Sequence, residues 1–214
     1  MKLCELMEET EPSDGSLIGK TVNGVMISKH TRGMDWMGGF DCSHQRLKSL
    51  DGAPTSVETD FSCQGNLLTS LEGAPALVGA GFFCYSNKLT SLKGAPPMLP
   101  RGEFSCAWNK LTSLEGAPSS VRYSFLCQDN RLTSLEGIHR ILKQIGGEFV
   151  ARGNPIESHV LGVLLIDRLT KIDLDEERVK DIVNKYLPNK TGRSVLIHCQ
   201  NELLDAGFEG YAKL

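Results

Sequence analysis

A motif of about 21 residues recurs through the middle of this 214-residue chain, and it limits the possible folds more than any other feature. The clearest copies are FSCQGNLLTSLEGAPALV from Phe61, FFCYSNKLTSLKGAPPML from Phe82, FSCAWNKLTSLEGAPSSV from Phe104 and FLCQDNRLTSLEG from Phe125. An earlier copy begins at Phe40, and a degraded one, FVARGNPI, begins at Phe149. A unit this short cannot bury its own apolar side chains, so successive units must stack on one another. The chain is therefore predicted to form a solenoid of about six repeats.

Each unit opens with an alternating segment that is typical of a short strand. Phenylalanine and cysteine stand two residues apart, so their side chains point to one side and the flanking residues point to the other. We expect the Phe, Cys, Leu and Val residues of successive units to form buried rows across a parallel sheet. The asparagine after the strand is expected to bond to backbone groups, since its side chain both donates and accepts. Gln45 replaces this asparagine in the first copy.

A Gly-Ala-Pro turn follows the leucines of each unit and leads to another apolar residue. The period is too short for a full helix in this return arm, and Gly with Pro disfavours one there. An extended or 3₁₀ return arm is therefore predicted.

These residues resemble the leucine-rich repeat L-x-x-L-x-L-x-x-N-x-L, with Phe and Cys at the second and third apolar positions. The short period and the Ala-Pro-x-x-Val turn are similar to the compact repeats of secreted bacterial effectors. The Leu-Thr-Ser-Leu-Glu-Gly-Ala-Pro units are more similar still to short repeat proteins encoded by large tailed phages. The resemblance covers residues 39–156 and implies an α/β solenoid with a curved parallel sheet.

The phage likeness implies an accessory protein that binds a host factor and redirects or inhibits it, in the cytoplasm of the host. Effectors with similar repeats have a large separate ligase domain. Only about 58 residues follow the repeats here, so that activity is not implied.

Three regions are expected, because the open ends of a solenoid need caps. They are an N-terminal cap at residues 1–38, the repeats at 39–156 and a C-terminal helical cap at 157–214. The tail is expected to hold three helices, at residues 157–169, after a capping-box-like start at 173–176, and from Thr191 to near Gly207. Residues 1–9 are predicted as a helix, and residues 21–27 as a strand or a hairpin that turns at Asn23-Gly24.

The charge balance and the termini exclude several functional classes. The formal net charge of −3 provides no overall basic field, so neither nucleic acid nor an anionic membrane is the expected partner. No stretch approaches the 18 or so apolar residues of a membrane span. The chain begins with acidic residues where an export signal needs an apolar run, so a cytoplasmic location is expected.

The seven cysteines are expected to be structural and not catalytic or metal-binding. Five of them, Cys42 to Cys127, occupy the same inward position of successive strands, whereas zinc sites pair ligands at short spacing. The run from Gly15 to Thr21 is one residue short of a phosphate-binding loop. No histidine stands in an evident pair with a nucleophile. No catalytic residue, cofactor or metal is therefore predicted.

The outward positions of the middle strands predict the functional site. Phe83, Tyr85, Trp108 and Leu126 are expected to form one exposed apolar cluster, which typically marks an interaction surface. Candidate contacts around this cluster are Gln64, Gln128 and a basic row of Lys88, Lys110 and Arg131. A protein partner is the leading interpretation, with self-association or cover by a terminal segment left open. The alternative function is an enzyme, or an enzyme inhibitor, whose site lies in either cap.

Overall fold

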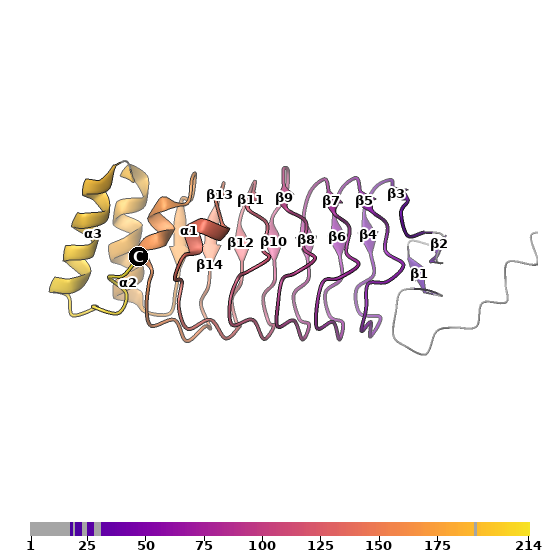
Figure 1. The fold of residues 1–214 in the computed structure, drawn as a ribbon, viewed down its shortest axis with the longest axis horizontal. Coiled ribbons are helices and arrows are strands. Elements are labelled where there is room, and N and C mark those ends of the chain that lie inside the picture. The colour runs from indigo at the N-terminus through magenta and orange to yellow at the C-terminus, as the bar shows by residue number, and fades with distance from the viewer. Residues whose placement is uncertain (1–17, 19, 23–24, 28–30, 191) are drawn as a thin grey trace, which may run out of the picture.

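The computed structural model describes residues 18, 20–22, 25–27, 31–190 and 192–214. The chain winds as a parallel β-solenoid of about six turns, stacked along one axis, with helices at the C-terminal end (Figure 1). The predicted solenoid is confirmed.

One strand from each turn joins a parallel sheet of seven strands. In spatial order these are β15 (Lys171–Asp173), β14 (Glu148–Val150), β12 (Phe125–Leu126), β10 (Phe104–Ser105), β8 (Phe82–Phe83), β6 (Phe61–Ser62) and β4 (Phe40–Asp41). The pairing aligns equal positions of the motif, so Phe104 lies opposite both Phe82 and Phe125. A one-residue slip would turn the buried phenylalanines outward, which is why the repeated pattern fixes this register.

The return arms are extended, as predicted, and form two smaller parallel sheets. One consists of β3 (Asp35–Trp36), β5 (Ser56–Val57) and β7 (Leu77–Val78), and the other of β9 (Met98–Leu99), β11 (Ser120–Val121) and β13 (Gln144–Ile145). The last return arm departs from this pattern with a short helix, α1 (Ile138–Ile141), which begins after Gly137. That copy lacks the Ala-Pro of the others, so nothing in its sequence prevents a helical turn.

Six phenylalanine rings form a continuous stack through the core. Consecutive ring centroids lie 5.1 to 5.8 Å apart, from Phe40 at one end to Phe149 at the other. The cysteines from Cys42 to Cys127 form a second buried row beside it. Burial raises the pKa of these thiols far above the ordinary value, which keeps them neutral.

A ladder of buried asparagines links each turn to the one before it. Asn109 is representative. Its Oδ1 accepts a hydrogen bond from the backbone N–H of Leu89 at 2.9 Å, and its Nδ2 donates to the carbonyls of Cys84 and Cys106 at 3.1 and 3.0 Å. The predicted backbone bonding is confirmed, and it spans two turns. At the first turn Gln45 instead donates from Nε2 to the carbonyl of Thr21 at 3.4 Å, which ties that turn to the N-terminal segment.

The N-terminal segment forms an antiparallel hairpin of β1 (Thr21–Val22) and β2 (Val25–Met26), with Thr21 opposite Met26. This confirms the hairpin alternative for residues 21–27. The predicted turn at Asn23-Gly24 and the predicted helix at 1–9 lie outside the described residues.

The tail differs from the predicted three helices at its start. Residues 157–169 contain only a short 3₁₀ helix, η2 (Leu161–Leu165), so the prediction of a full helix there is wrong. Strand β15 then extends the main sheet, with Ile172 buried opposite Phe149. The alternation of Lys171, Ile172 and Asp173 suits a strand with one inward side chain, and pairing with β14 satisfies its backbone.

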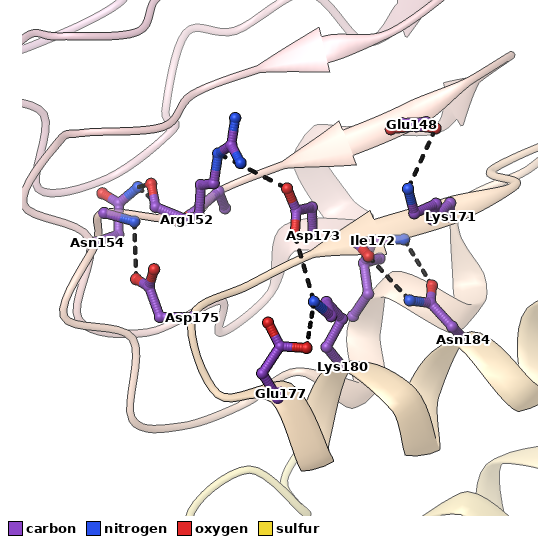
Figure 2. A network of polar contacts seen from close by, with 12 residues as sticks. Glu148, Arg152, Asn154, Lys171, Ile172, Asp173, Asp175, Glu177, Lys180 and Asn184 are labelled. Carbon is purple, nitrogen blue, oxygen red and sulfur yellow. Dashed lines mark hydrogen bonds and ion pairs between the residues drawn. The ribbon is translucent and has the colours of Figure 1, made fainter.

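The two later helices are confirmed as α2 (Glu177–Tyr186) and α3 (Arg193–Asp205), with a short 3₁₀ segment, η3 (Leu187–Asn189), between them. The expected capping box does not form, because no side chain caps α2. Figure 2 shows that acidic residues of the segment before α2 make other polar contacts instead. Asp173 pairs with Arg152 at 3.7 Å and with Lys180 at 3.8 Å, and Asp175 accepts a hydrogen bond from the backbone N–H of Gly153 at 2.7 Å.

Asn184 of α2 closes the edge of the sheet. Its side chain accepts from the backbone N–H of Ile172 at 2.8 Å and donates to the carbonyl of the same residue at 2.9 Å (Figure 2). Open backbone groups on an edge strand invite pairing with another chain, so α2 protects β15 from such pairing. Among the described residues, every helix is too short or too polar to serve as a membrane span.

Candidate functional site

The outward positions of β8, β10 and β12 create a hollow on the main sheet. Ser105 of β10 lies directly between Phe83 of β8 and Leu126 of β12 in the register of the sheet. The same register places Ala107 between Tyr85 and Gln128. A strand with small outward residues between two strands with large ones leaves a depression over the small ones.

The hollow has a volume of about 390 Å³. Ser105 lies at its base with 5% of its surface exposed. The side chains that line the hollow are Ser62, Gln64, Phe83, Tyr85, Glu103, Ser105, Trp108, Leu126 and Gln128. Six of the nine predicted contact residues are therefore together in one place, namely Phe83, Tyr85, Trp108, Leu126, Gln64 and Gln128.

Trp108 is the most exposed residue of this group, with 53% of its surface accessible. Its ring meets that of Tyr85 edge to face, with centroids 6.2 Å apart and planes at 69°. Phe83, Tyr85 and Leu126 are half-buried. The predicted exposed cluster is therefore a partly buried wall with one projecting indole.

The backbone of Trp108 lies in the left-handed region, with φ at 51°. All six copies of the repeat bend in this way at the same position, and the other residues there are His44, Gly65, Ser86, Asp129 and Gly153. Left-handed backbone disfavours bulky side chains and costs about 1–2 kcal/mol for residues other than glycine. Trp108 is the one large apolar residue in the series, so the fold alone does not favour tryptophan at this position.

Ala107 lies on the outward face of the sheet but is not exposed. The alternation of the strand points its side chain outward, yet the residue is fully buried. The larger side chains at the flanking positions, Tyr85 and Gln128, cover a residue as small as alanine. The hollow arises from this difference in size.

Glu103 supplies the negative charge of the hollow. Its carboxyl group is partly buried, and burial together with the nearby carboxylate of Asp60 raises its pKa above the ordinary value. Within the described part of the chain, neither of these two acids forms an ion pair. Gln128 adds a second acceptor, because its side-chain oxygen is buried and has no hydrogen-bond partner among the residues that the structure describes. Such an atom is rare in native structures and calls for an explanation.

The basic row lies outside the hollow. Lys88, Lys110 and Arg131 are exposed, and each follows a ladder asparagine directly in the chain. Lys110 is two residues beyond Trp108, so their Cα atoms are at most about 7 Å apart. The row therefore borders the hollow without lining it.

Alternation places Ser62 and Ser105 on the outward face, but sequence reasoning missed Glu103 as a lining residue. Period-two alternation could have found Glu103, because it stands two residues before Ser105 and four before Ala107 on the same face. The repeated motif begins at the phenylalanine, so the repeat itself gives no signal at the position before it.

A serine–histidine contact in the last repeat bears on the alternative of an enzyme. Ser134 Oγ lies 3.1 Å from Nδ1 of His159, beside a hollow of about 190 Å³. The serine also accepts from the backbone N–H of Glu136, and Ser49, Ser91 and Ser113 make the same bond in other turns. In the part of the chain that the structure describes, no carboxylate is hydrogen-bonded to His159. The hydrogen bond that Ser134 makes within the turn of its repeat therefore explains why a serine stands at this position.

No cluster of three or more His, Cys, Asp or Glu side chains suited to a metal is present among the described residues. Cys199 is buried, and burial raises the pKa of its thiol to about 12. Cys4 lies outside the described residues.

No known family model matches this chain, and a search of the curated proteins finds no match either.

Proposed function

We propose that this protein binds a protein partner, and that the hollow between β8 and β12 is the contact surface. The observation that supports this most directly is Trp108, a half-exposed indole on strained backbone. Strain of this kind persists where a function requires it. Tryptophan and tyrosine are also the residues that most often dominate the binding energy of an interface.

The form of the hollow favours a protein over an enclosed small molecule. Small-molecule sites bury most of the ligand in a cleft, whereas this hollow lies open on the face of a sheet. The basic row along its border adds charge for acidic side chains of the same partner, which would increase the rate of association. The likeness to phage repeat proteins favours a host factor as that partner, and inhibition or redirection of it as the outcome.

The proposal is tested by capture of partners on the immobilised protein, followed by affinity measurement with Trp108→Gly. Glycine occupies the equivalent position in two other turns, at Gly65 and Gly153, so the backbone tolerates it. Leu77→Ser is the matched control. Leu77 is an exposed apolar residue of a return arm, and serine stands opposite it at Ser56.

A true partner binds Leu77→Ser as it binds the unmodified protein, and its affinity for Trp108→Gly falls by about 2 kcal/mol, or roughly 30-fold. Equal binding by both variants would place the contact elsewhere. Loss of partner binding with Leu77→Ser alone would place the contact surface on the return arms. Dimerisation that depends on Trp108, with no captured protein, would identify a second copy as the occupant.

A further inference from the structure

We propose that the hollow receives the guanidinium group of an arginine side chain from the partner. This inference rests on the proposed function, because the arginine belongs to the protein that binds there. It follows from three features of the lining, which are the aromatic faces, the two acceptors without a donor and the lack of a lysine or arginine among the described lining residues.

Three aromatic side chains line the hollow. Tyr85 and Trp108 meet at 69°, and the ring of Phe83 lies over Gly81 beside Asp60, level with Glu103 in the register of the sheet. The faces of such rings are electronegative, so they attract a cation placed within about 6 Å of a ring centroid. A planar guanidinium can also stack on a ring, which a compact ammonium cannot do.

Two of the polar groups of the hollow, the side chains of Glu103 and Gln128, are acceptors that lack a donor among the described residues. Glu103 has no ion pair among the described residues, and the raised pKa of its carboxyl group reflects burial and repulsion from Asp60. A bound cation would offset both effects. Gln128 Oε1 has no donor either. A terminal amide rotates readily about its last torsion, so this oxygen can turn toward a donor inside the hollow.

Among the described residues, the chain itself supplies no cation to the hollow. The basic residues nearest in sequence to the lining strands are Lys88, Arg101, Lys110, Arg122 and Arg131, and none of them lines it. An arginine from outside offers five N–H donors in a fixed planar arrangement. Those donors suit the carboxylate of Glu103 and the amide oxygen of Gln128, and the plane of the group suits the aromatic faces that line the same hollow.

The test uses the full chain and three short capped peptides that differ at one central residue, which is arginine, lysine or citrulline. Citrulline has nearly the shape of arginine but no charge. The indole N–H resonance of Trp108 is followed by NMR during each titration. Trp36 is the internal control, because its indole N–H already donates to the carbonyl of Gly39 at 3.1 Å.

The arginine peptide is expected to shift the Trp108 resonance saturably, without moving that of Trp36, and to bind at least several-fold more tightly than the other two peptides. Glu103→Gln is expected to remove the preference for arginine over citrulline while leaving citrulline binding unchanged. Equal shifts with arginine and citrulline, or no shift up to the solubility limit, would refute the arginine site.

These outcomes are separate from those of the proposed function. A partner that requires Trp108 but binds Glu103→Gln normally would leave the contact surface valid and refute the arginine. An arginine-specific shift without any partner that depends on Trp108 would instead refute the proposed protein contact at this hollow.

Discussion

Replacement of Trp108 by glycine separates a functional role from a structural one. Three effects on the free energy of unfolding are expected. Relief of left-handed backbone at φ 51° stabilises the variant by about 1–2 kcal/mol. The greater freedom of unfolded glycine destabilises it by about 0.5–1 kcal/mol. Loss of the edge-to-face contact with Tyr85, together with the surface that the half-buried indole removes from water, destabilises it by a further ~1–3 kcal/mol.

These effects partly cancel, so Trp108→Gly is expected to lower the free energy of unfolding by no more than about 3 kcal/mol, whereas removal of a tryptophan from a core costs about 3–5 kcal/mol. The assay is urea denaturation followed by far-UV circular dichroism, alongside the affinity measurement for the captured partner. Circular dichroism is preferred to fluorescence because the substitution removes one of the two tryptophans.

A large loss of stability with binding intact would refute this reasoning. It would mean that the indole supports the fold and that the left-handed position has no functional cause. Unchanged stability with a loss of binding agrees with it.

Three further predictions concern the fold. The thiols of Cys42 to Cys127 are expected to react with a thiol reagent only on unfolding, since burial raises their pKa values and hides the sulfur atoms, and fast labelling of the native protein would contradict the buried row. Asn109→Ala is expected to lower the free energy of unfolding by about 1–3 kcal/mol, because it leaves the buried N–H of Leu89 without its acceptor, whereas the carbonyls of Cys84 and Cys106 keep hydrogen bonds from Asn87 and Asn130; a loss well below ~1 kcal/mol in urea denaturation would show that the ladder is dispensable. A chain that ends at Ile156 is expected to aggregate during size-exclusion chromatography, because β14 then loses β15 and the cover of α2; a monomer with unchanged melting would show that the tail is an independent unit.

The repeat region was predictable because its copies constrain one another. Phe104, Cys106 and Asn109 recur at equal spacing in neighbouring turns, and only a parallel register buries all of them at once. Alternation then identifies the outward residues, which is why most of the hollow could be predicted from the sequence.

Features that depend on a single copy were not predictable in this way. Strand β15 rests on one inward residue, Ile172, in a segment that resembles no repeat. The hollow depends on the small size of Ser105 and Ala107 relative to their cross-strand neighbours, a comparison that needs the register first. The left-handed backbone of Trp108 could not be predicted, because the equivalent residues include histidine, serine and aspartate and are not consistently glycine.

The central claim is that a partner covers the hollow and leaves the return arms free. Hydroxyl-radical footprinting of the chain, alone and with a captured partner, measures this directly through the oxidation of individual side chains. Trp108 and Met98 are suitable reporters, since both are reactive and their exposed fractions are nearly equal, at 53% and 54%. Protection of Trp108 and Tyr85 with unchanged oxidation of Met98 is the predicted result. Protection of Met98 with full oxidation of Trp108 would place the partner on the return arms and contradict the account.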